Sequence, residues 1–420
     1  MAHIHHFRTL EQVQRRSLQE VRSDRHAAAN FAAFCGGRQQ REAVGLHEME
    51  RCCGKRGVVL IHNDPQLEGH LGRIYDRNPL LRRLPAQFQM YLANPNGAAN
   101  AFYDPLYGLS ASYVLDILCP ASDDGFRSET QAVRSALSDY LELLRFQCSK
   151  HPTPFGASPY NLDLLLELTR MPYSDLERNV LAFLPQPLSG QLMGRLSQSG
   201  SQQKAFHAVR AFAQAMNKCL WTPRGFAGHT KLSIIQAVRE KCLISIYVPG
   251  SRSEILDYLA VELQALNDQN APYLLVTSGI TLPNSPRFQS LFLQEHSAIN
   301  YATGILAEDL SSAVQTDASD RTQAALFGQL QELFVFACSS TLAAAPFSAG
   351  IGQYYRQVTE RHMDKHRDPF RIFSSHGHGM AQREVQQAVV NPEELTRLGD
   401  GCLLYGKNHP IPILIQHFTL

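Results

Sequence analysis

Apolar residues along this 420-residue chain gather in short runs that end at turn residues, and longer amphipathic stretches separate these runs. The first clear run lies within residues 57–65, where Gly-Val-Val-Leu-Ile is followed by His-Asn-Asp-Pro. A run of this kind is typical of a strand that is buried on both faces of a parallel sheet. The same pattern predicts further strands at 88–92, 242–248, 273–277, 303–306, 334–338, 401–405 and 411–417.

The stretches between these runs have helical spacing. Residues 111–118 follow Ser110, which is suited to capping a helix N-terminus, and residues 254–266 form a second clear example. The polar segment 8–30 is predicted as a further helix ahead of the first strand. Strands that alternate with helices of this length predict an α/β fold with a doubly wound, mostly parallel sheet, because each crossover helix covers one face.

The character of the chain changes over its middle part, where no strand signal interrupts the helical spacing of leucines such as Leu164 and Leu168. We therefore predict three parts. They are 1–155 as the first part of the α/β domain with its N-terminal helix, 156–240 as an all-helical insertion, and 241–420 as the second part of the α/β domain.

The charge of the chain is balanced, with 39 Lys and Arg against 38 Asp and Glu, and the formal net charge is +1. Such a chain has no global field to attract DNA or an anionic membrane, so any nucleic-acid contact would be local. The nine cysteines lie mostly in apolar runs, which indicates buried thiols in a reducing compartment. There is no apolar stretch of about 18 residues, and residues 1–10 lack a signal-peptide core, so we expect a cytoplasmic protein without direct membrane insertion.

Several phrases of the sequence occur in the order in which one family of motor proteins carries them. They are Val-Val-Leu-Ile-His-Asn-Asp-Pro-Gln-Leu at 58–67, Tyr-Asp-Pro-Leu at 103–106, a strand and helix start at 334–340 and 344–352, and Asn-Pro-Glu-Glu-Leu at 391–395. Together they resemble the TraG/TraD-like coupling proteins of conjugation and type IV secretion, in the FtsK and HerA group of RecA-fold motors. The resemblance spans about 35–420 and implies a RecA-like sheet with an all-helical domain near 156–240.

The resemblance also implies an ATP-binding loop of the form Gly-x-x-x-x-Gly-Lys-Ser/Thr, whose backbone amides wrap the phosphates and whose lysine meets the β and γ phosphates. The aligned segment begins with Gly36 and Gly37. After them, Arg41 replaces the second glycine, Glu42 the lysine and Ala43 the hydroxyl residue. A carboxylate about 4 Å from a phosphate, in place of an ammonium, costs roughly 4 kcal/mol at an effective dielectric constant near 20. We therefore expect no tight triphosphate binding in the usual pose.

The second nucleotide motif of the family departs from its pattern independently. The apolar run 273–276 should end in Asp-Glu, the carboxylates that hold the metal and activate water. Ser278 and Gly279 stand at those positions instead. Two separate losses indicate an active site that has been lost. The alternative is that Gly36 and Gly37 form an ordinary turn between a helix and a strand, which would leave the predicted fold unchanged.

A basic segment near the C-terminal end could contact a nucleic acid or another subunit. Its cations are Arg356, Arg361, Lys365, Arg367 and Arg371, with aromatic residues between them and Glu360, Asp364 and Asp368 diluting the charge. We predict a solvated helix face, with a DNA groove and a subunit interface as the alternatives.

No other cluster predicts a metal site or a nucleophile. His376 and His378, with His362 and His366 nearby, have no acidic or cysteine partners at metal-ligand spacing, so we predict surface histidines. The adjacent pair Cys52–Cys53 suits neither zinc nor a redox pair of the Cys-x-x-Cys kind, and we interpret it as packing. No Gly-x-Ser-x-Gly phrase occurs.

The sequence therefore leads to one expected function with two rivals. The first is a non-catalytic, pseudo-ATPase component of a conjugative DNA-transfer or type IV secretion apparatus, acting as a scaffold or adaptor with no catalytic residue and no cofactor. The second is an active ATP-dependent translocation motor with an unorthodox or shared active site, which would need ATP and magnesium. The third is a DNA-binding module. Expected partners are other secretion or conjugation subunits, a second copy of this chain or DNA, in the cytoplasm or docked at the inner face of the membrane.

Overall fold

The computed structural model describes most of the chain, with gaps. The described residues are 14–16, 30–77, 90–93, 101–119, 127–150, 160–197, 200–216, 230–293, 301–314, 320–365 and 376–415. They divide into two compact units. The larger unit holds the described residues of 26–32 and 41–329, and the smaller unit holds those of 1–25, 33–40 and 330–420.

A set of parallel strands forms the centre of the larger unit. Their order is β9 (Tyr301–Ala307), β8 (Tyr273–Ser278), β3 (Gly57–His62), β7 (Leu243–Tyr247) and β4 (Met90–Ala93), and each neighbouring pair is parallel. His62 lies beside Ser278 on one side and Tyr247 on the other, so the carboxyl ends of three strands meet at one edge. Because β3, β8 and β9 are buried along their whole length, the predicted α/β class with a mostly parallel sheet is confirmed.

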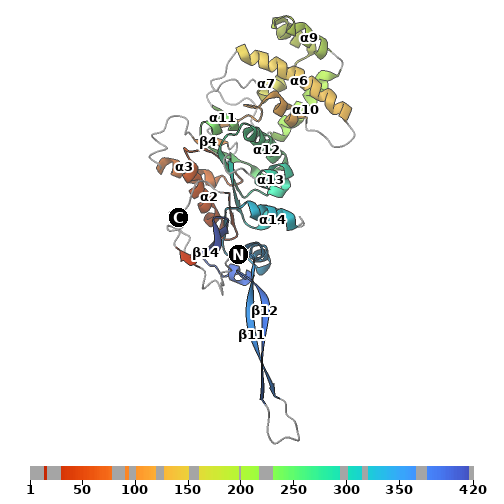
Figure 1. The fold of residues 1–420 in the computed structure, drawn as a ribbon. Helices are drawn as coiled ribbons and strands as arrows, with labels where there is room; N and C mark the ends of the chain where they lie inside the picture. Colours follow the sequence, from red (N-terminus) through yellow and green to blue (C-terminus); the bar gives the residue numbers. More distant parts are fainter. Residues whose placement is uncertain are drawn as a thin grey trace. The chain divides into compact units, whose positions relative to one another are not determined.

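Helices cover both faces of these strands (Figure 1). On one side lie α2 (Arg38–Cys52) and α3 (Gln66–Arg77), and on the other lie α12 (Ser253–Asp268) and α13 (Pro286–Leu293). The larger unit also contains α11 (Ile234–Arg239), α14 (Asp320–Gln329) and the 3-10 helices η4 (Pro249–Ser251), η5 (Leu282–Asn284) and η6 (Leu310–Ser312). Such a layered arrangement is what alternating strands and helices require, since each crossover must cover a face of the sheet.

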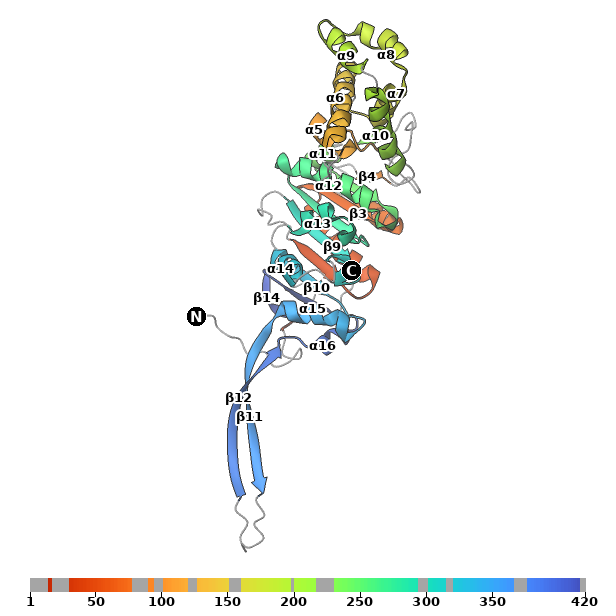
Figure 2. The same cartoon turned by 90° about the vertical axis from the view of Figure 1, so that its right-hand side faces the viewer.

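A helical segment separates β5 (Ala101–Tyr103) from β6 (Thr230–Leu232). It contains α5 (Ala111–Leu118), α6 (Arg127–Lys150), α7 (Leu162–Arg170), α8 (Tyr173–Asn179), η3 (Leu181–Phe183), α9 (Leu188–Leu196) and α10 (Ser201–Met216). Figure 2 shows α6, α7 and α10 side by side, and their apolar faces bury Leu144, Leu165 and Val209 completely. β5 and β6 pair in parallel, so the chain leaves for this segment and returns from it on neighbouring strands.

The predicted boundaries of the insertion differ from the extent of these helices. The range 156–240 contains α7 to α10 and also β6, whereas α6 precedes it. α5 occupies the predicted residues 111–118, and Ser110 is its N-cap residue. The Ser110 hydroxyl bonds the Ser112 hydroxyl at 2.8 Å rather than a backbone amide of the helix. The position of the cap is therefore as predicted, and its hydrogen bond is not.

The smaller unit contains a mixed group of strands. Their order is β1 (Gln14–Arg16), β14 (His409–Ile415), β13 (Cys402–Gly406) and β10 (Glu332–Val335). β1 is parallel to β14, and the other two neighbouring pairs are antiparallel. The end of β2 (Phe31–Phe34) belongs to this unit, where the Phe336 amide donates to the Phe34 carbonyl at 3.0 Å. The helices α15 (Thr341–Ile351) and α16 (Pro392–Thr396) pack together, and α16 starts with a capping box between Asn391 and Glu394.

A hairpin replaces the helix face predicted for the basic segment. β11 (Gln353–Lys365) pairs with β12 (His376–Ala388) in antiparallel register, 13 residues on each strand. The helix prediction is therefore wrong. Tyr354, Tyr355 and Val358 are residue types that favour a strand. In the hairpin, the backbone N–H and C=O groups of each strand pair with those of the other, and the spacing of the cations did not indicate this pairing.

At the start of the chain, one prediction fails and one strand is missed. Residues 14–16, inside the predicted helix 8–30, form β1 beside residues 413–415, a long-range pairing that no local pattern reveals. β2 was not predicted, because its four residues Phe-Ala-Ala-Phe are too short to show a period. Among the described residues, none of the helices combines the length and the apolar character needed to span a membrane.

Candidate nucleotide site

The loop that leads from β2 into α2 is only three residues long, from Cys35 to Gly37. Cys35 and Gly36 both have positive φ, at 62° and 61°. The Gly36 amide donates to the Ala337 carbonyl at 2.9 Å. A Cβ on Gly36 would lie 2.4 Å from the Phe336 Cβ, so this position requires glycine for its conformation and for its close packing.

Gln40 closes this loop from the helix side. Its Oε1 accepts from the Gly37 amide at 2.8 Å, and its own amide donates to the Gly37 carbonyl at 3.1 Å. A phosphate-binding loop needs backbone amides that point into an open cradle. Here the neutral side chain of Gln40 takes one of those amides, and the helix already begins at Arg38. The Gly37 amide is therefore bonded within the chain, at the position where the resemblance predicts an amide that binds phosphate.

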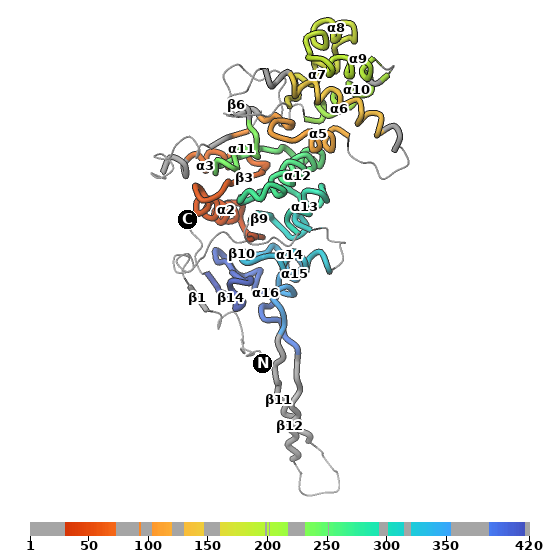
Figure 3. Tube along the Cα trace, turned by 45° about the horizontal axis from the view of Figure 1, so that its top comes forward, coloured from red at the N-terminus to blue at the C-terminus, as the bar shows by residue number. Residues whose placement is uncertain are grey.

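The three replaced motif residues all lie inside α2, which runs beside β9 (Figure 3). Glu42 and Ala43 are buried, at 7% and 6% exposure, and Arg41 is half-buried. The helix approaches β9 closely, because a Cβ on Gly45 would lie 2.4 Å from Leu306 Cδ1. The position at which the resemblance predicts the lysine of the motif thus holds a buried carboxylate, on a helix that packs closely against β9.

The end of β8 is closed by an asparagine from the neighbouring strand. Asn63 donates from Nδ2 to the Gly279 carbonyl at 2.6 Å, and its amide donates to the Ser278 carbonyl at 3.3 Å. Gly279 has a φ of 66°, and a Cβ there would lie 2.2 Å from Asn63 Oδ1. No aspartate or glutamate fits at position 279 without moving Asn63, and the Ser278 side chain is buried at 3% exposure. This position therefore cannot supply the metal-binding acids of the motif.

The sequence analysis missed a pair of carboxylates one strand away. The Gly279 amide donates to the Leu306 carbonyl at 3.2 Å, and Glu308 and Asp309 follow the end of β9. Asp309 accepts from the Ser311 hydroxyl at 2.6 Å and from the Ser312 amide at 3.0 Å as the cap of η6. Burial alone would raise the pKa of Asp309, but these hydrogen bonds outweigh it and hold that pKa below its ordinary value. Asp309 is thus a structural cap, whereas the Glu308 side chain is exposed.

A buried polar cluster lies at the same edge of the sheet, at the end of β3. The His62 Nε2 lies 2.8 Å from the Ser245 Oγ and 3.7 Å from the Glu68 Oε1. His62 and Ser245 are fully buried, and Glu68 is 7% exposed. Serine and carboxylate both face the same ring nitrogen, whereas a nucleophilic triad needs them on opposite nitrogens. The cluster therefore joins β3, β7 and the first turn of α3, and it does not activate the serine.

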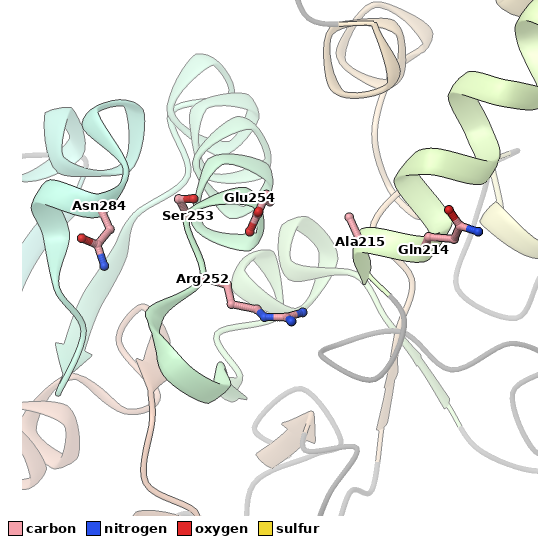
Figure 4. Close-up of a pocket in the computed structure, with 6 residues that line it drawn as sticks. All are labelled: Gln214, Ala215, Arg252, Ser253, Glu254 and Asn284. Atoms are coloured by element: carbon pink, nitrogen blue, oxygen red, sulfur yellow. The ribbon is translucent and has the colours of Figure 1, made fainter.

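A polar cavity of about 550 Å³ lies between α10, the start of α12 and η5 (Figure 4). The residues that line it are Gln214, Ala215, Arg252, Ser253, Glu254 and Asn284. It opens beyond the carboxyl ends of β7 and β8, where ligands bind in doubly wound sheets. The sequence analysis named none of these residues, because they come from three separate segments without a shared motif.

Three of the five basic residues predicted to contact DNA or another subunit lie on the hairpin strand β11, and Arg371 lies outside the described residues. Arg356 pairs in register with Val385, Arg361 with Met380 and Lys365 with His376. Arg367 lies outside the described residues. Among the described residues, no group of three or more histidine, cysteine or acidic side chains is placed to hold a metal ion.

Strands in parallel order, helices on both faces and a helical segment between β5 and β6 define the RecA-like fold of conjugative coupling proteins. The solved structures with this fold include the coupling protein TrwB with the GTP analogue GDPNP. It is 13% identical, with a TM-score of 0.54 over 97% of this chain and 94% of that chain. TrwB with the ATP analogue ADPNP is 13% identical, with a TM-score of 0.52 over 97% and 94%. The unbound monoclinic form of TrwB is 11% identical, with a TM-score of 0.52 over 96% and 92%.

These likenesses establish the fold. No protein-family model matches the sequence, and no curated protein matches it. The fold implied by the phrases at 58–67, 103–106 and 391–395 is therefore confirmed by the three-dimensional comparison, although identity is only 11–13%.

Proposed function

We propose that this chain is a non-catalytic component of a conjugative DNA-transfer or type IV secretion apparatus, in which it acts as a scaffold or adaptor. The proposal joins two observations. The fold matches TrwB over nearly the whole of both chains. At the predicted nucleotide positions, Gln40 bonds the Gly37 amide and Asn63 bonds the Gly279 carbonyl. In this proposal the chain keeps the shape of a coupling protein for assembly and has lost hydrolysis, so it needs neither ATP nor magnesium.

The closure of the loop by Gln40 is the single observation that carries the proposal. TrwB is described in complexes with ADPNP and GDPNP. In this chain, the Gly37 amide is bonded to Gln40 Oε1 and the helix starts before the position of the missing lysine. Anion binding by backbone amides depends on those amides being available to the ligand. The buried carboxylate of Glu42 would also repel the phosphates, in addition to the loss of the Gly37 amide as a donor to them.

The proposed partners follow from the fold. We expect this chain to assemble with other secretion or conjugation subunits, with further copies of itself or with DNA, in the cytoplasm or docked at the inner face of the membrane. The long hairpin formed by β11 and β12 suits such contacts, because β11 carries Arg356, Arg361 and Lys365 along its length.

We expect that ATP and magnesium do not bind to this chain. Purified protein melted with about 1 mM ATP and magnesium should show no rise in Tm over the protein alone. If the folded protein bound ATP with a Kd of about 10 μM, about 1 mM ATP would raise its free energy of unfolding by about 2.7 kcal/mol. A melting curve would detect this stabilisation. Isothermal titration calorimetry with the non-hydrolysable analogue ADPNP checks the same point without hydrolysis.

A matched variant separates the effect of the Glu42 charge from the effect of the Gln40 contact with the loop. Glu42→Lys restores the charge of the motif but leaves Gln40 on the loop, so we expect it to bind ATP no better than the unmodified chain. Micromolar ATP binding together with hydrolysis that is lost on changing Glu42 or Ser278 would contradict the proposal. Binding gained by Glu42→Lys alone would show that charge, and not the closed loop, excludes the nucleotide.

One observation favours the rival function, an ATP-dependent motor with an unorthodox or shared site. Glu308 presents an exposed carboxylate beyond β9, next to the strand that lacks its acids. If the chain hydrolyses ATP only when assembled, Glu308→Gln should abolish that activity, whereas Glu177→Gln, an exposed change on α8, should not. Activity that survives Glu308→Gln would remove the support that this residue gives to the rival.

A further inference from the structure

Two cysteines that are 303 positions apart in the sequence meet beside the candidate loop. Cys35 is the first residue of that loop, and Cys338 follows the end of β10. Their Sγ atoms lie 3.0 Å apart, and each residue is 5% exposed. Both belong to the smaller unit.

The backbone holds these sulfurs together. The Phe336 amide donates to the Phe34 carbonyl at 3.0 Å, and the Gly36 amide donates to the Ala337 carbonyl at 2.9 Å. The Cys338 amide donates to the Leu395 carbonyl at 3.0 Å, which ties its other side to α16. The approach of the two sulfurs therefore results from the pairing of two chain segments. A disulfide needs a sulfur separation of about 2.05 Å, so a movement of about 1 Å would close the bond.

The chemical environment distinguishes this pair from other thiols in the chain. The hydrogen bond with Cys35 holds the pKa of Cys338 below its ordinary value, against the opposing effect of burial. Burial instead raises the pKa of Cys52 to about 11 and that of Cys53 to about 12. Because the thiolate is the form that reacts, Cys338 is the better nucleophile of the three.

We propose that Cys35 and Cys338 form a redox-active pair, which hydrogen peroxide oxidises to a disulfide that pins the loop between β2 and α2. The Cys338 thiolate attacks one peroxide oxygen, the O–O bond breaks, and the departing hydroxide takes up the proton that Cys338 had released, so a sulfenic acid and one water result. The Cys35 sulfur then attacks the sulfenic sulfur, the S–S bond forms, and a second water leaves with the Cys35 proton. Two thiols lose two electrons, and one peroxide is reduced to two waters.

The pair suits a reversible sensor. Disulfides of cytosolic proteins are usually transient and redox-sensing. Cys338, the thiol that reacts first, is followed directly by the exposed residues Ser339 and Ser340, which places it near the surface for a small peroxide. The crosslink would fix the left-handed conformation of Cys35 and Gly36, and with it the start of α2. The inference does not depend on nucleotide binding, so it can fail or succeed separately from the proposed function.

Peptide mapping of the full chain tests the pair. Reduced protein is exposed to hydrogen peroxide, unfolded and alkylated, and the number of alkylated cysteines should fall from nine to seven. Trypsin digestion without reductant should release peptides 26–38 and 322–356 joined to each other, since each contains one cysteine. Dithiothreitol should restore the count to nine. A count that stays at nine, or a crosslink between other cysteines, would overturn the proposal.

Variants identify the order of the steps. Cys35→Ser keeps a hydrogen-bond donor beside Cys338 but cannot form a disulfide, so Cys338 should remain as a sulfenic acid that dimedone traps on peptide 322–356. Cys338→Ala should abolish both dimedone labelling and the crosslink. Cys402→Ala removes a buried thiol elsewhere in the same unit and should leave the crosslink unchanged. Dimedone labelling of Cys35 in place of Cys338 would contradict the assigned order. If a variant fails to fold, the mapping of the unmodified chain still decides whether the pair forms.

Discussion

Replacing Glu262 by glutamine is expected to abolish about 5 kcal/mol of pH dependence in the free energy of unfolding between about pH 4.5 and pH 8. Glu262 is fully buried on α12. Its Oε2 accepts from the Tyr103 hydroxyl at 2.6 Å, and its Oε1 accepts from the Ile234 amide at 3.2 Å. The residue therefore joins α12 to β5 and α11, at the two places where the helical segment begins and ends.

The sign of the effect follows from the protonation of the folded state. Burial raises the pKa of Glu262 from 4.5 to about 8, and the nearby Asp104 charge also raises it, although its two hydrogen bonds act in the opposite direction. Between these two values the folded protein keeps a proton that the unfolded chain releases. Stability from this group is therefore complete below about pH 4.5, declines as pH rises, and is lost above about pH 8.

Urea unfolding at a series of pH values between 5 and 9 measures this slope. Glutamine is neutral at every pH, so the curve for Glu262→Gln should be flatter than that of the unmodified chain, and the variant should be the more stable protein at pH 9. Glu254→Gln, an exposed change on the same helix, should leave the slope unchanged. Parallel curves for Glu262→Gln and the unmodified chain would show that Glu262 ionises normally in the folded protein.

Replacing Gly57 by alanine is expected to destabilise the protein by about 3 kcal/mol. Gly57 is the first residue of β3, where a Cβ would lie 2.8 Å from the Cα of Val238 and 2.9 Å from its carbonyl oxygen. These are backbone atoms of α11 and cannot rotate away as the end of a side chain can. The clash must move either α11 or the central strand of the sheet.

The same chemical change at an open site provides the control. Gly194 lies inside α9, and a Cβ there would meet no atom within 4 Å. Gly194→Ala should therefore raise stability by up to about 1 kcal/mol, because alanine is the better helix former. Urea midpoints of the two variants test the contrast. A loss at Gly57 no larger than the change at Gly194 would mean that β3 and α11 adjust freely.

Local pattern was sufficient for the central strands. β3, β8 and β9 are apolar runs buried on both faces, and the runs at 57–65, 273–277 and 303–306 identified them. The local pattern of apolar and polar residues did not predict the elements that form by pairing with distant segments of the chain. β2 has four residues, β1 pairs with the other end of the chain, and the hairpin of β11 and β12 carries cations that also fit a helix.

For the candidate site, too, some features could be predicted from the sequence and others appear only in the tertiary structure. The sequence by itself predicts that Glu42 stands in place of a lysine and that Ser278 and Gly279 stand in place of acids, because a motif is recognised from residue types at fixed spacings. Only the tertiary structure decided that Gln40 closes the loop, that Asn63 fills the space beside Gly279 and that Cys35 meets Cys338. The contacts of Asn63 with Gly279 and of Cys35 with Cys338 join segments far apart in the chain. The contact of Gln40 with Gly37 depends on where α2 begins. Such contacts depend on how elements pack, and packing is decided by the whole fold rather than by any one segment.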